Sequence, residues 1–135
     1  QRLASPCIYV LADSNSDSDI LKAVKAGRSY FAFSPTKLQL LLDVDGQTFG
    51  ASLVWREGMQ ASMKALALEK GDIIRLITQE GAKDIFTAPE KGGFETSLLV
   101  TGPSYWRLEV WRTFYSFLPP MPALITNPIW FDRTK

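Results

Sequence analysis

Apolar and polar residues alternate along most of this chain with a period of two, the pattern typical of half-buried β-strands. The longest such stretch is residues 105–114, YWRLEVWRTF, in which Trp106, Leu108 and Val110 share one face. Burying these three side chains should contribute roughly 2 kcal/mol each, so this face is predicted to enter the core. The other face mixes two aromatic residues with an Arg and a Glu, and is interpreted either as packed beneath a neighbouring segment or as a contact surface: Tyr105, Arg107, Glu109, Trp111 and Thr113.

Further strands are predicted at intervals of roughly ten residues. Between residues 37–44 and 47–55, Asp45-Gly46 favours a type I′ turn because both central positions of that turn take positive φ. Gly50 predicts an irregularity in the second of these strands. Residues 60–69 are good helix formers, but their alternation and the flanking turns predict a strand. The remaining strands are residues 29–34, 73–79, 84–87, 94–100 and 124–131, the last confined to an edge or broken at Pro128.

Residues 17–26 depart from this alternation, because Ile20, Leu21 and Val24 form one apolar stripe with helical spacing and Gly27 stands at the expected helix end. This helix and a short strand at residues 7–11 make residues 1–34 a predicted connector, followed by a β-sandwich domain at residues 35–135. The predicted fold is therefore all-β, a two-sheet sandwich of about nine short strands with one short N-terminal helix. Immunoglobulin-like and jelly-roll strand paths both remain open.

The length, net charge and cysteine content of the chain limit the kinds of partner and environment to be expected. The 135 residues suit one domain, and a net charge of +1 offers no field that would recruit nucleic acid or an anionic membrane. No apolar run reaches the roughly 18 residues of a membrane-spanning helix, so membrane insertion is not expected. The single cysteine, Cys7, cannot form an intrachain disulfide. We expect a soluble chain whose fold does not depend on disulfides, in a compartment that the sequence does not reveal.

Histidine is absent, which removes the commonest general base and the usual transition-metal ligand. Asp13, Asn15 and Asp17 match the start of a calcium loop, but Ser18 and Val24 stand where that loop needs Gly and Glu. We therefore predict no catalytic residue, no metal ligand and no cofactor in this chain, which is not expected to be an active enzyme alone.

Two other classes of function can be compared from the sequence. A glycosidase would need two acids facing each other across a cleft, but the acids lie mostly in predicted turns, and an ion pair with Arg107 is the simpler account of Glu109. A carbohydrate- or ligand-binding sandwich would instead use exposed aromatic rings, because sugars present apolar C–H faces. The candidates for such an aromatic surface are Tyr105, Trp111, Trp55 and Trp130.

Four segments resemble a known family when taken in their order and spacing. Residues 20–30 (ILKAVKAGRSY), followed by a strand that ends in Ser34-Pro35, look like the segment after the catalytic part of PHP (polymerase and histidinol phosphatase) superfamily metallohydrolases. In that family a helix ending in Gly-Arg-Thr/Ser-Tyr/Phe leads into a β-sandwich. The resemblance continues through residues 71–77 (GDIIRLI), 105–110 (YWRLEV) and 126–130 (TNPIW), and so covers nearly the whole chain loosely.

The resemblance implies a detached C-terminal accessory domain of a metal-dependent phosphoesterase or related hydrolase, which supports the catalytic barrel or its assembly. A chain that starts with Gln1 fits a piece of a longer protein. The divalent metals of the family are expected in the missing barrel, and no catalytic residue carries over because its histidine motifs are lacking here. The implied partner is the chain's own upstream catalytic domain, homo-oligomerisation remains open, and the implied interdomain contact residues are Ile20, Leu21, Val24 and Arg28.

Overall fold

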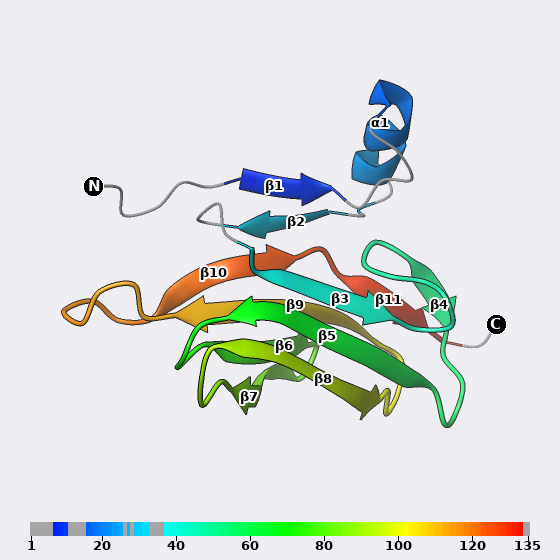
Figure 1. Ribbon diagram of the computed structural model, residues 1–135. Helices are drawn as coiled ribbons and strands as arrows, with labels where there is room; N and C mark the ends of the chain where they lie inside the picture. Colours follow the sequence, from blue (N-terminus) through cyan, green and yellow to red (C-terminus); the bar gives the residue numbers. More distant parts are fainter. Residues whose placement is uncertain (1–6, 11–15, 26, 28, 33–36, 134–135) are drawn as a thin grey trace.

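The computed structural model describes residues 7–10, 16–25, 27, 29–32 and 37–133. Their strands form one eight-stranded and one three-stranded sheet, stacked as a sandwich (Figure 1). This architecture confirms the predicted all-β fold with a single short helix in the described part of the chain.

The larger sheet contains β1 (Cys7–Val10), β2 (Ser29–Ala32), β4 (Ser52–Val54), β6 (Ile73–Thr78), β7 (Gly81–Thr87), β9 (Ser104–Arg112), β10 (Met121–Thr126) and β11 (Ile129–Asp132). The smaller sheet contains β3 (Gln39–Asp43), β5 (Gln60–Leu68) and β8 (Gly92–Leu99). The helix α1 (Asp17–Lys25) lies between β1 and β2 in the chain.

Strand β9 is the centre of the larger sheet. It pairs with β6 on one edge, and with β10 and then β11 on the other, all antiparallel to it. Strands β10 and β11 cover the predicted strand at residues 124–131, and the expected break at Pro128 is confirmed. Strand β10 begins earlier than predicted, at Met121. Trp106, Leu108 and Val110 are buried, also as predicted. The alternating pattern of one strand thus fixes which face of the sheet enters the core.

Both sheets contribute to one hydrophobic core. The rings of Trp106 and Phe131 meet edge to face with their centroids 5.6 Å apart, which closes the core beneath β9 and β11. Phe86 of β7 and Phe94 of β8 stack at 3.7 Å between centroids and join the two sheets along one side. Other members of the core are Leu40, Leu42, Phe49, Met63, Leu68, Ile74 and Leu124.

The backbone conformation at the turns agrees with the predictions from the sequence. Asp45 and Gly46 both have positive φ, at 50° and 80°, as a type I′ turn requires. Gly50, with φ of 90°, precedes a strand shortened to Ser52–Val54, which confirms the predicted irregularity. The ambiguous helix-forming segment is strand β5, the middle strand of the smaller sheet, with a register shift near Ala67, where φ is 61°.

The predicted connector contributes to the larger sheet. Strand β2 pairs with β10, and β1 pairs with β2, so both strands extend the sheet beyond β10. The Ser16 hydroxyl accepts a hydrogen bond from the Asp19 amide at 3.3 Å and caps α1. At the other end of the helix, Gly27 has φ of 73°, and a Cβ there would lie 3.0 Å from the Gly50 Cα. Glycine is therefore required at this position by both conformation and space.

Candidate functional site

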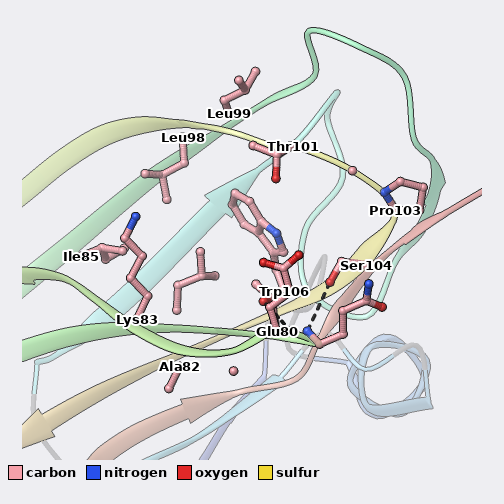
Figure 2. A pocket seen from close by; sticks show the side chains of 15 residues that line it. Glu80, Ala82, Lys83, Ile85, Leu98, Leu99, Thr101, Pro103, Ser104 and Trp106 are labelled. Carbon is pink, nitrogen blue, oxygen red and sulfur yellow. Dashed lines mark hydrogen bonds between the residues drawn. The ribbon is translucent and has the colours of Figure 1, made fainter.

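The two sheets separate at one end of the sandwich and leave a cleft of about 560 Å³ (Figure 2). Its sides are the edge strands β7 and β8, which in the described chain pair only with β6 and β5. These two strands meet at the Phe86–Phe94 stack, and the cleft is lined by residues 81–83 at the start of β7 and residues 98–99 at the end of β8. We call this space the Trp106 cleft, defined by the apolar Leu76, Ile85, Leu98 and Trp106 and the polar Thr78, Gln79, Glu80, Lys83, Thr101 and Ser104.

One turn and the start of β9 position the polar side of the cleft. The turn from β6 to β7 contains Gln79 and Glu80, and its backbone is held by hydroxyl groups. The Glu80 amide donates to Thr78 Oγ1 at 3.1 Å, and the Gln79 amide makes a long hydrogen bond of 3.4 Å to Ser104 Oγ. The second bond attaches the turn to the first residue of β9. The polar rim is therefore anchored to the central strand.

Trp106 lies in the middle of the cleft, as Figure 2 shows, with only 5% of its surface exposed. No described residue accepts a hydrogen bond from its indole Nε1–H, and that nitrogen is not sealed from solvent. By contrast, the Trp55 indole donates to the Val100 carbonyl and the Trp111 indole to Glu109 Oε1, each at 2.8 Å. Because Trp106 lines the cleft and its N–H has no acceptor in the described chain, this N–H is a donor that a molecule in the cleft can reach.

Opposite charges flank the same space. Glu80 and Lys83 are exposed at its rim, and in the described chain neither belongs to an ion pair. A carboxylate offers hydrogen-bond acceptors and an ammonium offers donors, while the hydroxyls of Thr78 and Thr101 provide both. The rim can thus bind a neutral ligand that carries several hydroxyl groups.

A second, smaller hollow of about 230 Å³ adjoins the cleft through Gln79, Pro103 and Ser104. Tyr105 and Trp130, paired across β9 and β11, line it with ring centroids 5.5 Å apart. Trp130 is 45% exposed. Two of the four predicted surface aromatics therefore lie together at the open end of the sandwich.

The other two aromatics do not join them. Trp55 packs against the core, with its indole bound to a backbone carbonyl. Trp111 lies at the opposite end of β9, where the Arg75 guanidinium carbon is 4.6 Å from its ring centre and Glu109 accepts its N–H. No single surface contains all four rings.

Charged groups on β9 are neutralised within the sheet. Glu109 is buried, and its Oε2 lies 3.1 Å from Arg107 Nη2, which confirms the ion pair predicted from the alternating face. Asp72 is an exception among the acids, which the sequence places mostly in turns where charged side chains are usually solvated, because it is only 1% exposed. Its two oxygens accept from Arg112 Nε at 2.9 Å and Nη2 at 2.7 Å. Arg112 lies on the apolar face of an alternating strand, and this was the sequence signal for a buried partner.

The predicted interdomain residues lie on or beside α1. Leu21 is 58% exposed and Ile20 is half-buried. The side chain of Val24 and the whole of Arg28 lie outside the described residues, as do Asp13 and Asn15 of the partial calcium pattern. Within the described ranges no three His, Cys, Asp or Glu residues cluster as a metal site would require.

The alternating pattern of the sequence does not reveal the cleft residues. Trp106 was assigned to the core alone, and neither Glu80 nor Lys83 was singled out. The available signal was an indole at the start of a strand, directly after the turn Thr101-Gly102-Pro103. A core side chain next to a turn lies at the margin of a sandwich, where its polar atom can reach solvent.

Comparisons with known proteins identify no relative. No protein-family model matches this chain, and neither does any curated protein or solved structure. No helix in the described residues has the length and apolar character needed to cross a membrane.

Proposed function

We propose that this chain is a non-catalytic accessory domain of a PHP-type metal-dependent hydrolase, in which it supports the catalytic barrel or its assembly. The observation that carries the proposal is the placement of the four segments that resemble this family. They contribute β2, the β10–β11 junction, β9 and β6, which are neighbouring strands of one sheet. Residues that carry the resemblance pair directly, Tyr30 with Thr126 and Ile74 with Val110. The segments therefore act as one structural unit.

A contact between two of these segments supports the same proposal. The Asn127 side-chain amide donates to the Gly27 carbonyl at 3.0 Å, although the two residues are far apart in the chain. This bond joins the end of α1 to the junction between β10 and β11. Two of the four segments that carry the resemblance are thus in direct contact through Gly27 and Asn127. A connector from a preceding domain would be fixed to the sandwich at this point.

The surface proposed to meet the catalytic barrel is the exposed side of α1. Figure 1 shows the helix at the margin of the sandwich, beyond β1 and away from β7 and β8. Leu21, with more than half of its surface exposed, offers an apolar contact there, and Ile20 continues it. Burying one leucine at an interface contributes roughly 2 kcal/mol.

The first test is the sequence that precedes Gln1 in the parent gene. We expect a His-x-His pair and further His and Asp clusters, because the metals of this family are held by such groups. An upstream region without histidine clusters would contradict the proposal.

The second test measures docking of the separately produced upstream domain onto this chain. Leu21→Glu should weaken association by about tenfold or more, since a charge would replace the buried apolar contact. Val54→Glu is the matched control, because Val54 is 52% exposed but lies on β4. Equal binding by both variants would count against α1 as the docking surface.

A second candidate function is a carbohydrate-binding module, which the paired rings of Tyr105 and Trp130 favour. Trp130 is exposed enough to stack on the apolar face of a sugar. Tryptophan fluorescence should then change on addition of a polysaccharide, and Trp130→Ala should abolish the change. An unchanged signal across a panel of polysaccharides would contradict this candidate.

A further inference from the structure

We propose that the Trp106 cleft binds a single sugar residue, such as the end of a glycan, which accepts a hydrogen bond from the Trp106 indole N–H. The proposal does not require the accessory role. It also does not require the ring pair of Tyr105 and Trp130, which lines the neighbouring hollow.

The open donor is the first argument. Trp106 is almost completely buried, yet its Nε1–H has no acceptor among the described residues and reaches the cleft. The same atom is satisfied in Trp55 and in Trp111. A ligand oxygen in the cleft would supply the acceptor that the protein lacks. The indole therefore selects a ligand that carries oxygen acceptors.

The volume of the Trp106 cleft and the apolar residues that line it also fit a sugar. About 560 Å³ falls within the range of roughly 300–1,000 Å³ usual for small-molecule sites. Leu76, Ile85 and Leu98 form apolar walls around the indole. A sugar ring has an apolar C–H face for such walls and hydroxyl oxygens around its perimeter, so both of its surfaces have a counterpart here.

The charge at the rim is the third argument. Figure 2 shows Lys83 on one side of the cleft and Glu80 on another, and neither is committed to an ion pair in the described chain. One acid and one base give the rim no net charge, which favours a neutral ligand over an anion. Sugar hydroxyls donate to a carboxylate and accept from an ammonium, and the hydroxyls of Thr78 and Thr101 extend this set.

Nuclear magnetic resonance of the tryptophan indole groups tests the proposal directly. The four indole N–H signals of the full chain would be followed during titration with the methyl glycosides of glucose, mannose, galactose and N-acetylglucosamine. We expect at least one glycoside to move the Trp106 signal saturably, while the signals of Trp55 and Trp111 stay in place because their protons are already bonded. No saturable movement at about 100 mM of any of the four would overturn the proposal.

Substitutions distinguish the contribution of the Trp106 N–H to binding from that of the apolar ring. Trp106→Phe keeps most of the apolar volume and removes the N–H, so we expect the affinity to fall about tenfold. Trp55→Phe is the matched control and should leave the affinity unchanged, because that indole is bound to Val100. Equal affinity of Trp106→Phe and the unmodified chain would refute the indole contact.

Rim variants preserve the test if Trp106→Phe fails to fold. Glu80→Gln and Lys83→Ala change exposed side chains, and each should lower affinity severalfold. If neither weakens binding, the sugar does not occupy this cleft. Trp130→Ala should leave binding of the methyl glycosides intact, which distinguishes this site from the polysaccharide-binding surface of the second candidate function.

Discussion

The two ends of strand β9 differ in whether their polar side chains find hydrogen-bond partners within the protein. At the Arg112 end the polar groups are satisfied within the protein, since Asp72 receives two hydrogen bonds from the guanidinium and a third from the Glu69 amide. On the same side of the sandwich, the stacked Phe86 and Phe94 close the gap between the sheets. At the Ser104 end the sheets separate, and the Trp106 donor is left open toward a cleft.

One end of β9 therefore contributes mainly to the stability of the fold, and the other end is available to bind a ligand. A buried charge with a complete set of partners holds the fold in one arrangement, and it has no remaining capacity for a ligand. A donor that opens into a cleft and has no acceptor within the protein adds no internal hydrogen bond to the fold, but it can bind an acceptor on a ligand. We therefore expect substitutions at the Arg112 end to change the free energy of unfolding, and those at the Ser104 end to change binding.

The largest effect is expected from Asp72→Ala. It leaves the mostly buried Arg112 guanidinium without its counter-charge, and the free energy of unfolding should fall by about 3–5 kcal/mol. Urea unfolding followed by circular dichroism would measure this. Asp84→Ala is the matched control, because the Arg75–Asp84 pair is half exposed on the acid side and its loss should cost no more than about 1 kcal/mol.

A double variant sharpens the result. Asp72→Ala combined with Arg112→Leu removes the uncompensated charge and should recover part of the stability that the single variant loses. If Asp72→Ala cost no more than Asp84→Ala, the Arg112 end would not be the stabilising end.

A smaller effect is expected from Phe94→Ala. The substitution removes half of the ring stack that holds β7 against β8, and the loss of packing should destabilise the protein by about 2–4 kcal/mol. Leu99→Ala, at the open end of the same strand, is the control and should change the unfolding free energy by less than about 0.5 kcal/mol because Leu99 is 55% exposed. Similar losses in thermal or urea unfolding would mean that β8 is held equally along its length.

Much of the fold was predictable because the strands and turns depend on residues that are close together in the sequence. Alternation identified the core face of β9, and it outweighed the helix propensity of β5, whose inward residues Ala61, Met63 and Ala65 are all buried. The turn at Asp45-Gly46 and the break at Pro128 followed from backbone sterics at single residues. Each of these features is decided within a few residues of the chain.

The candidate site was less predictable because it depends on distant segments. The pairing of Asp72 with Arg112 requires the register between β6 and β9, which alternation does not determine. The cleft requires two edge strands of different sheets to diverge. Pattern reasoning grouped Trp111 with Tyr105 correctly by face, but it could not show that Glu109 and Arg75 would engage one ring while Trp130 approached the other.

The smallest effect compares two indoles. Trp55→Phe removes the hydrogen bond to the buried Val100 carbonyl, whereas Trp106→Phe removes an N–H that no described residue accepts and enlarges a space already open to solvent. Trp55→Phe should therefore reduce the free energy of unfolding by about 1 kcal/mol more than Trp106→Phe, as measured by urea unfolding. A larger loss for Trp106→Phe would show that its side chain mainly stabilises the fold, and the contrast between the two ends of β9 would fail.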